Sequence, residues 1–126
     1  MNVLRFHLAH HLIGSGAHGD LFLDTGEQSL PTYEISEQDL KALQAKVSGL
    51  ESFRFELSAD VKARALGWPV YRKADHRRKY LEYEGPISGD RGYLKSVFKG
   101  NANFSFPLEP LPEKLWFEVH TDAVLD

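Results

Sequence analysis

Residues 36–57 read S-E-Q-D-L-K-A-L-Q-A-K-V-S-G-L-E-S-F-R-F-E-L, and they predict a helix followed by a strand. Ser36 is a suitable N-cap, and Asp39 stands three residues further on, where a capping box has its acidic residue. Apolar residues then recur at helical spacing on one face: Leu40, Leu43, Val47 and Leu50. Residues 52–57 alternate strictly between polar and apolar, as a half-buried strand does. The pattern places the helix near residues 37–48.

The rest of the chain offers many short strand candidates separated by glycine turns. They are residues 3–9, 20–24, 69–73, 80–84, 93–99, 103–106 and 115–119. Residues 61–66 fit either an alternating strand or a short helix, and residues 11–19, with three glycines, predict a flexible loop. Many short strands with one helix predict a mainly β fold, a small closed β-barrel with the helix packed on it. No linker or repeat divides the chain, so we expect a single domain over residues 1–126.

Composition excludes several function classes. The chain has 126 residues and no cysteine, which excludes disulfides, thiolate catalysis and Cys-based zinc sites and fits a cytoplasmic protein. The net charge of −3 argues against a protein that coats nucleic acid through bulk charge, but it allows a local basic patch. Apolar runs stay well below the roughly 18 residues of a membrane span, so we expect no membrane association.

A basic run surrounds a histidine and a tyrosine. His76 and Tyr80 are four residues apart, and cations crowd the same region: Arg72, Lys73, Arg77, Arg78 and Lys79. A histidine can act as an acid or a base near neutral pH, and a tyrosine hydroxyl can donate to a phosphate oxygen. The alternative is a solvated loop in which His76 belongs to a turn and Tyr80 to a strand.

A second group of chemical side chains lies near the N-terminus. In an extended segment His18 and Asp20 project to the same side, and both are good ligands for a divalent metal such as Mn or Zn. His11 can supply a third ligand, which leaves coordination positions open for catalysis. His10 competes with His11 for this role, although neighbours in an extended chain face opposite sides. The alternative is a histidine hydrogen-bonded to a turn aspartate. The remaining histidines show no such pattern: His7, which we expect to be packed or on the surface, and His120, which has no partner in its vicinity.

Three motifs together resemble a known family. They are H-x-D before an apolar strand, D-H-x-x-x-Y-L-x-Y-E-G, and G-P-I-S-G-x-R-G. The combination resembles the phosphoesterase domain of bacterial DNA ligase D, and it is most similar to the short stand-alone relatives of that domain. The resemblance covers roughly residues 3–24 and 69–100, and the segment between them does not align.

The resemblance implies a fold, an activity and a set of site residues. Such domains are small β-barrels and manganese-dependent phosphoesterases (hydrolases) that process DNA 3′ ends in repair. They remove a 3′-terminal ribonucleotide and then a 3′-phosphate. Carried over by motif, His11, His18 and Asp20 bind the metal, with Mn²⁺ expected and Zn²⁺ as an alternative, while His76 and Tyr80 contact the phosphate. His76 is also a candidate acid for the leaving group. The expected partners are a nucleic-acid 3′ end and a DNA ligase or polymerase, and we expect a monomer.

The sequence also departs from the family. Two positions after its metal aspartate, the ligase D domain carries an arginine that contacts phosphate. This chain has Phe22 at that position, and other short relatives also have an apolar residue there. The phosphate contact then has to come from elsewhere, and the candidates are Arg77, Arg78 and Arg91. Two other functions stay open: a binding module for phosphorylated DNA ends or a repair partner, without turnover, and a scaffold protein that docks through the helix at residues 36–50.

Overall fold

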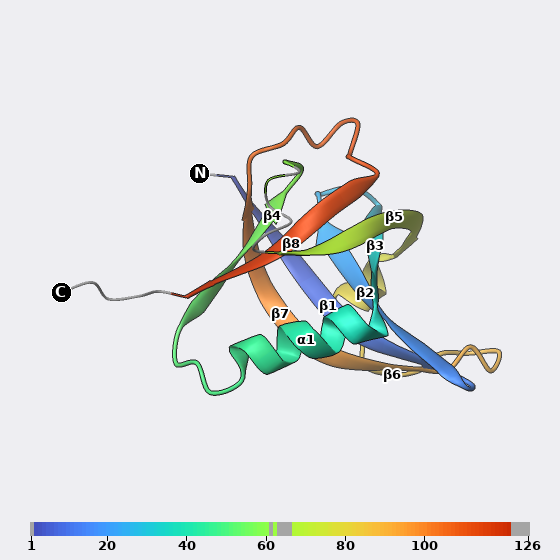
Figure 1. The fold of residues 1–126 in the computed structure, drawn as a ribbon. Helices are drawn as coiled ribbons and strands as arrows, with labels where there is room; N and C mark the ends of the chain where they lie inside the picture. The colour runs from blue at the N-terminus through green and yellow to red at the C-terminus, as the bar shows by residue number, and fades with distance from the viewer. Residues whose placement is uncertain (1, 61, 63–66, 122–126) are drawn as a thin grey trace.

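The computed structural model describes residues 2–60, 62 and 67–121 of the chain (Figure 1). Its one α-helix, α1, covers Glu37–Val47, and a short 3-10 helix, η2, covers Arg78–Leu81. The strands are β1 (Val3–Ile13), β2 (Gly16–Asp24), β3 (Ser29–Ser36), β4 (Phe53–Ser58), β5 (Gly67–Arg77), β6 (Gly85–Pro86), β7 (Tyr93–Phe104) and β8 (Lys114–Thr121).

Seven of the described strands close into a barrel. Their order is β1-β2-β3-β5-β8-β4-β7, and β7 pairs back with β1, so the sheet has no free edge among them. The pairings are antiparallel except for β4 with β7, and the two-residue β6 adds to β7. The predicted fold class, a small closed β-barrel with one helix, is confirmed.

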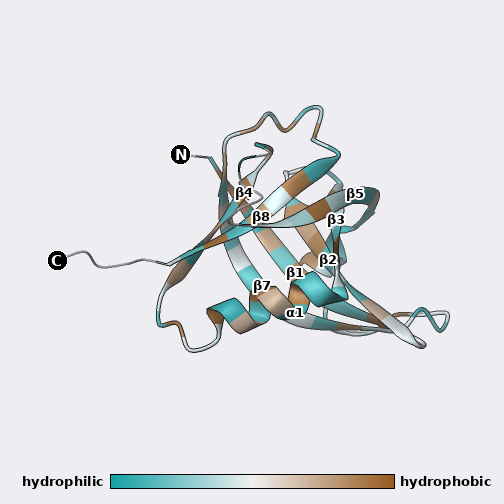
Figure 2. Cartoon of the chain, in the orientation of Figure 1, coloured by the Kyte–Doolittle hydropathy of each residue, from teal (hydrophilic) through white to brown (hydrophobic). Residues whose placement is uncertain are grey.

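Alternating side chains fill the barrel. Leu4, Phe6 and Leu8 of β1 point inward, where Phe6 meets Phe55 and Phe117 edge-on at ring-centroid distances of 5.1 and 5.5 Å. Figure 2 shows the same alternation as brown and teal bands along the strands. The interior is therefore a packed apolar core.

Helix α1 lies against the barrel as the sequence predicted. The Ser36 hydroxyl accepts the backbone N–H of Asp39 at 3.1 Å, which caps the helix, and its apolar face enters the core. The buried residues on that face are Leu40, Leu43 and Val47. Among the described residues, no helix is long and apolar enough to cross a membrane.

The predicted loop at residues 11–19 is a β-hairpin instead. β1 continues to Ile13 and β2 begins at Gly16, which leaves a turn of two residues. His11 lies directly opposite His18 in this ladder. The glycines suggested flexibility, but cross-strand hydrogen bonding fixes the backbone as soon as the two strands pair.

Other predictions along the chain also need correction. The prediction of a strand at residues 80–84 is wrong. Tyr80 and Leu81 belong to η2, and a turn follows in which the backbone N–H groups of Glu82 and Tyr83 both bond to the carbonyl of Lys79. The predicted strand at residues 103–106 is only the end of β7. Strand β3 was missed, since Pro31 interrupts its pattern at a register irregularity. For residues 61–66 the sequence allowed either a strand or a short helix, and residues 61 and 63–66 lie outside the described residues.

A second, smaller apolar cluster lies on the outer face of the barrel. The side chains of Ala9 and Phe22 point to the opposite face of the sheet from the interior side chains, and they belong to the same cluster as Tyr80 and Leu81 of η2. We call residues 78–92 the cover segment, because they pack over this outer face. The cluster comprises Ala9, Phe22, Leu30, Tyr80, Leu81 and Leu94. The cover segment therefore creates a partly enclosed space outside the barrel core.

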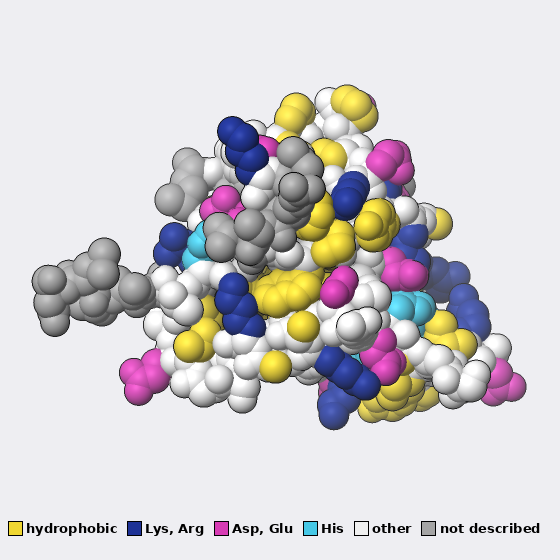
Figure 3. All heavy atoms as spheres, viewed as in Figure 1, with side chains coloured by type: hydrophobic (Ala, Val, Ile, Leu, Met, Phe, Trp, Pro, Cys, Tyr) yellow, Lys and Arg dark blue, Asp and Glu magenta, His cyan; other side chains and the backbone are white. Residues whose placement is uncertain are grey.

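The face drawn in Figure 3 carries charges of both signs. Apolar side chains gather between α1 and β8, and Lys or Arg alternates with Asp or Glu around them. A face of this kind does not form one broad basic field, in agreement with the net charge of −3.

Candidate functional site

The β1–β2 hairpin brings together the three predicted metal ligands. His11 and His18 face each other across the ladder with ring centroids 5.0 Å apart. Asp20 is 1% exposed, and its two carboxylate oxygens lie 3.3 Å from His11 Nδ1 and 3.1 Å from His18 Nε2. One ligand atom from each residue lies within 4.8 Å of the other two. His18 and Asp20 share one face because they are two residues apart on a strand, and the pairing of β1 with β2 places His11 beside them.

Gly19 allows the H-x-D motif to sit on this hairpin. It faces the barrel interior, where an added Cβ would lie 2.3 Å from Ile35 Cγ2 and 3.3 Å from Leu40 Cδ2. Any side chain would push the hairpin off the core below it. His18 and Asp20 can therefore share the outer face only with glycine between them.

The hydrogen bond of His11 fixes its tautomer. His11 Nε2 lies 2.8 Å from the main-chain carbonyl of Arg91, which can only accept, so Nε2 carries the hydrogen and Nδ1 the lone pair. His11 Nδ1 is buried without a hydrogen-bond partner among the described residues, and it faces a carboxylate oxygen of Asp20. Two acceptor atoms that face one another are satisfied when a cation lies between them. His11 Nδ1 and the Asp20 carboxylate therefore fit a metal site, and the hydrogen bond from His11 Nε2 to the Arg91 carbonyl is the one that commonly orients a ligating histidine.

His10 faces away from this group. Its Nε2 lies 3.6 Å from the carboxylate of Glu37 at the start of α1. Of the two neighbouring histidines, His11 is therefore the one that faces Asp20, as alternation in an extended strand requires.

A lysine and a second carboxylate complete the group. Lys73 Nζ lies 2.9 Å from Asp20 and 2.9 Å from Glu34, and 3.5 Å from His18 Nε2. Burial pushes the pKa of Asp20 up, but the hydrogen bond from His18 and the charge of Lys73 outweigh it and lower that pKa. The hydrogen bond to Asp20 raises the pKa of His18. The sequence did not point to Glu34, because strand β3 was not predicted. Lys73 was noted only as one of several cations near His76, with no link to Asp20.

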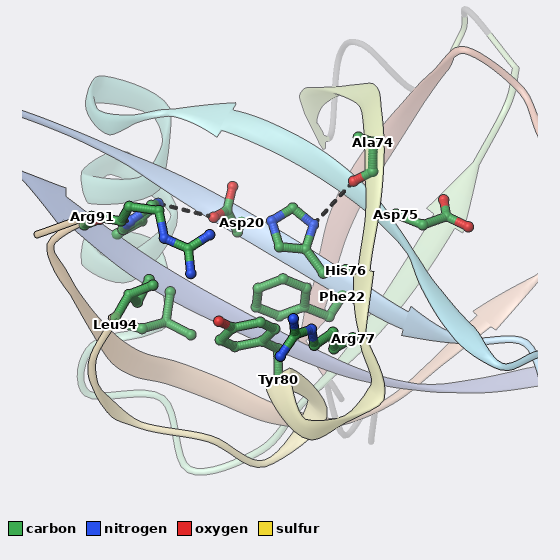
Figure 4. Close-up of a pocket in the computed structure, with 11 residues that line it drawn as sticks. Asp20, Phe22, Ala74, Asp75, His76, Arg77, Tyr80, Arg91 and Leu94 are labelled. Atoms are coloured by element: carbon green, nitrogen blue, oxygen red, sulfur yellow. Dashed lines mark hydrogen bonds and ion pairs between the residues drawn. The ribbon is translucent and has the colours of Figure 1, made fainter. Parts of the chain in front are cut away.

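Beside this group lies a cavity of about 380 Å³ under the cover segment. Six of the eight predicted site residues line it, and four of these are His11, Asp20, His76 and Tyr80. Arg77 and Arg91 also line it, and Figure 4 shows Arg91 on the side of Asp20 and Arg77 beside Tyr80. His18 is not part of the cavity lining, but its Nε2 lies 3.1 Å from Asp20, which is. Arg78 lies elsewhere, since it bonds Asp24 at 2.9 Å and the carbonyl of Glu27 at 2.8 Å.

His76 is held in one orientation by its backbone. Its Nδ1 lies 3.0 Å from the carbonyl of Ala74 and 3.1 Å from the hydroxyl of Thr32. Because the carbonyl only accepts, Nδ1 carries the hydrogen and Nε2 the lone pair. In Figure 4 Nε2 lies on the side of the ring nearer Asp20. Burial lowers the pKa of His76, so the ring is neutral at neutral pH.

Phe22 supports both His76 and Tyr80. Its ring stacks on Tyr80 at 5.8 Å with an interplanar angle of 20°, and it meets His76 edge-on at 5.3 Å. At this position, where the family has an arginine, the chain therefore provides an apolar wall that orients two polar side chains.

His7, which was expected to be packed or on the surface, is buried and holds η2 in place. His7 Nδ1 donates to the carbonyl of Tyr80 at 2.7 Å, and its Nε2 then accepts from the hydroxyl of Ser96 at 2.8 Å. His7 is fully buried, and burial lowers its pKa. The alternation of His7 with Ala9 and His11 is the signal that could have placed it on the site face.

A second group of candidate ligands lies on β4 and β8. Glu56, Glu118 and His120 place ligand atoms within 4.8 Å of one another. His120 Nε2 lies 3.4 Å from Glu118, so the expectation that His120 has no partner is wrong. Burial, followed by the charge of Glu56, raises the pKa of Glu118.

Comparison with known proteins adds no relative: no family model, no curated protein and no solved structure matches the chain. Any assignment of function therefore depends on the geometry described above and on the resemblance of the motifs.

Proposed function

We propose that the protein is a metal-dependent phosphoesterase that acts on nucleic-acid 3′ ends, removing a 3′-phosphate or 3′-ribonucleotide in DNA repair. One observation supports this most. Two groups of residues more than 50 positions apart in the sequence, His11 with Asp20 and His76 with Tyr80, line the same cavity. At about 380 Å³ it lies within the range of small-ligand sites.

His11, His18 and Asp20 are the proposed ligands of a divalent cation, Mn²⁺ in the first place and Zn²⁺ as the alternative. The donor set of two imidazole nitrogens and one carboxylate suits either ion. When bound, the ion supplies polarisation of the phosphoryl group and a bound water of lowered pKa. The Arg91 carbonyl keeps His11 Nδ1 directed at the site.

His76, Tyr80 and the two cavity arginines are proposed to handle the phosphoryl group. The Tyr80 hydroxyl donates to a phosphoryl oxygen, while Arg77 and Arg91 provide the positive charge that Phe22 does not. Because His76 is neutral with its lone pair on Nε2, it accepts a proton from the attacking water more readily than it donates one to the leaving group.

The test is phosphate release from a 3′-phosphorylated DNA oligonucleotide, measured with and without Mn²⁺. We expect Mn-dependent release by the wild type and loss of release in Asp20→Asn. The same oligonucleotide phosphorylated at its 5′ end is the substrate control, and Glu118→Gln is the protein control. Failure of the wild type to release phosphate at saturating Mn²⁺ or Zn²⁺ would contradict the proposal.

Phe22 favours a second candidate, a binding module without turnover. An apolar side chain at the position of the family's arginine lines the cavity but offers no contact to a phosphate. In that case the 3′-phosphorylated oligonucleotide binds wild type and Asp20→Asn alike, and no phosphate appears. For either function we propose a cytoplasmic monomer and a DNA ligase or polymerase as the partner that uses the processed or captured end.

A further inference from the structure

Lys73 lies where a cation would bind. Its ammonium is 2.9 Å from Asp20 Oδ1, 2.9 Å from Glu34 Oε1 and 3.5 Å from His18 Nε2. Asp20 Oδ1 is also the oxygen that contacts His18. The lysine therefore occupies two of the atoms on which the proposed metal site depends.

A divalent ion and this ammonium compete for those atoms. A divalent ion binds carboxylate and imidazole ligands at about 2 Å and needs their lone pairs. An ammonium at 2.9 Å from Asp20 already uses one of these lone pairs, and it would repel a divalent ion placed in the same group.

The side chain has room to leave. The side chain of Lys73 is 28% exposed and that of its second partner Glu34 is 46% exposed, whereas the side chain of Asp20 is almost fully buried. The lysine therefore reaches a buried carboxylate from the solvent side, on a flexible stem that can turn back toward water.

Given the proposed function on which this rests, we propose that Lys73 is a built-in competitor for the metal. Its ammonium neutralises Asp20 and Glu34 while the site is without metal, and the metal binds only when Lys73 withdraws. Glu34, whose carboxylate lies 3.6 Å from His18 Nε2, then loses its cation partner. The competition keeps metal affinity lower than His11, His18 and Asp20 alone would give.

The experiment compares Mn²⁺ binding by the wild type with Lys73→Met and Lys73→Gln, using the electron paramagnetic resonance signal of free Mn²⁺. We expect both variants to bind about tenfold more tightly or better, because each removes a positive charge from the ligand group. Lys73→Arg keeps the charge and should bind like the wild type. Lys95→Met removes an exposed lysine outside the site, and its effect should stay within about twofold because solvent screens it.

Thermal unfolding provides an independent readout. Without metal, Lys73→Met should melt below the wild type, since Asp20 and Glu34 lose their shared cation. Saturating Mn²⁺ should raise its melting temperature more than that of the wild type. A lysine with a purely structural role would lower the melting temperature equally with and without Mn²⁺.

The outcomes separate this inference from the proposed function. If wild type and Lys73 variants bind Mn²⁺ equally, or the variants bind more weakly, Lys73 is no competitor, while the metal-dependent function stands. If none of the proteins binds Mn²⁺ or Zn²⁺, both the metal-dependent function and the competition are overturned. Lys73→Gln retains a polar group toward Asp20, so it serves where Lys73→Met does not fold.

Discussion

Two groups on this barrel offer the same types of ligand in different surroundings. His11, His18 and Asp20 lie beside a cavity under the cover segment, and their carboxylate has a pKa lowered by His18 and Lys73 despite its burial. The group on β4 and β8, which contains Glu118, does not line this cavity, nor does it line a second cavity bounded by Thr25, Arg72 and Leu108. There the pKa of Glu118 is raised by burial and by a second carboxylate, so it takes up a proton more easily. Ligand spacing alone is a weak sign of a site, and access and charge balance decide between such groups.

The largest expected effect separates the two groups directly. Asp20→Asn should weaken Mn²⁺ binding by more than about 100-fold, which exceeds the effect usual for residues outside the ligand shell, and should remove phosphate release. Glu118→Gln should change neither. Both are measured by Mn²⁺ resonance titration and by phosphate release. An equal loss of metal binding in Glu118→Gln would remove the distinction between the two groups.

The next effect separates metal binding from the chemistry within the first group. His76→Ala should lower the rate of phosphate release by about 10²-fold or more, as loss of a general base does, while Mn²⁺ affinity stays within about twofold. Tyr80→Phe keeps the stack on Phe22 and removes only the hydroxyl, so it should show a smaller loss of the same kind. Single-turnover rates at saturating Mn²⁺ check both variants. A parallel loss of Mn²⁺ affinity would place these residues among the ligands instead.

The cover segment distinguishes the first group from the second, and Gly92 tests it. Gly92 has a φ of +99°, and an added Cβ would lie 1.9 Å from the carbonyl oxygen of Leu12. Gly92→Ala should therefore destabilise the protein by about 1–3 kcal/mol. Gly100→Ala, within strand β7, is the matched control. Its added Cβ would lie 3.8 Å from Phe6 Cε1, which is an ordinary van der Waals contact. Urea unfolding measures both, and equal stability of the two variants would mean that the cover segment can shift freely.

The smallest effect concerns pH and the histidine beneath the cover segment. Burial lowers the pKa of His7 below its ordinary 6.5, so the unfolded chain binds this proton more readily than the folded one. The stability that His7 contributes is therefore complete above pH 6.5 and is lost as the pH falls below it. The pKa of His18 is raised, so its contribution to the pH dependence of stability has the opposite sign. That contribution is present in both proteins and cancels when wild type is compared with His7→Gln.

We expect the unfolding free energy of wild type to fall more steeply between pH 7.5 and 5.5 than that of His7→Gln, because only the wild type carries the lowered pKa of His7. Urea unfolding at several pH values measures the difference between the two curves. Parallel curves would show that His7 titrates alike in both states.

Sequence reasoning succeeded where the signals are local. Ser36 and the apolar face of α1 define the helix over a few neighbouring residues, and His18 with Asp20 follows from a period of two. The positions of Glu34 and Lys73 could not be derived in this way. Glu34 reaches the site through the pairing of β3 with β2, a non-local contact that leaves no mark in the surrounding residues.

Local signals were also misleading where tertiary contacts decide. Tyr80 lies in a stretch that alternates like a strand, yet the carbonyl of Tyr80 accepts from His7 and its ring stacks on Phe22, which favours the 3-10 turn of η2. The three glycines at residues 11–19 pointed to a loop, although they serve strand packing and a two-residue turn.

Strand β1 carries Leu4, Phe6 and Leu8 on one side and His7 and His11 on the other. Inserting or deleting one amino acid in the middle of this strand would reverse the facing of every residue on one side of the change, so part of the apolar set would leave the core and imidazoles would enter it. Stability and ligand geometry would then fail in a single step, with no intermediate phenotype. Length variants of this protein should therefore be made in the connections at residues 14–15 and 25–28, and residues 3–13 should be kept at their native length.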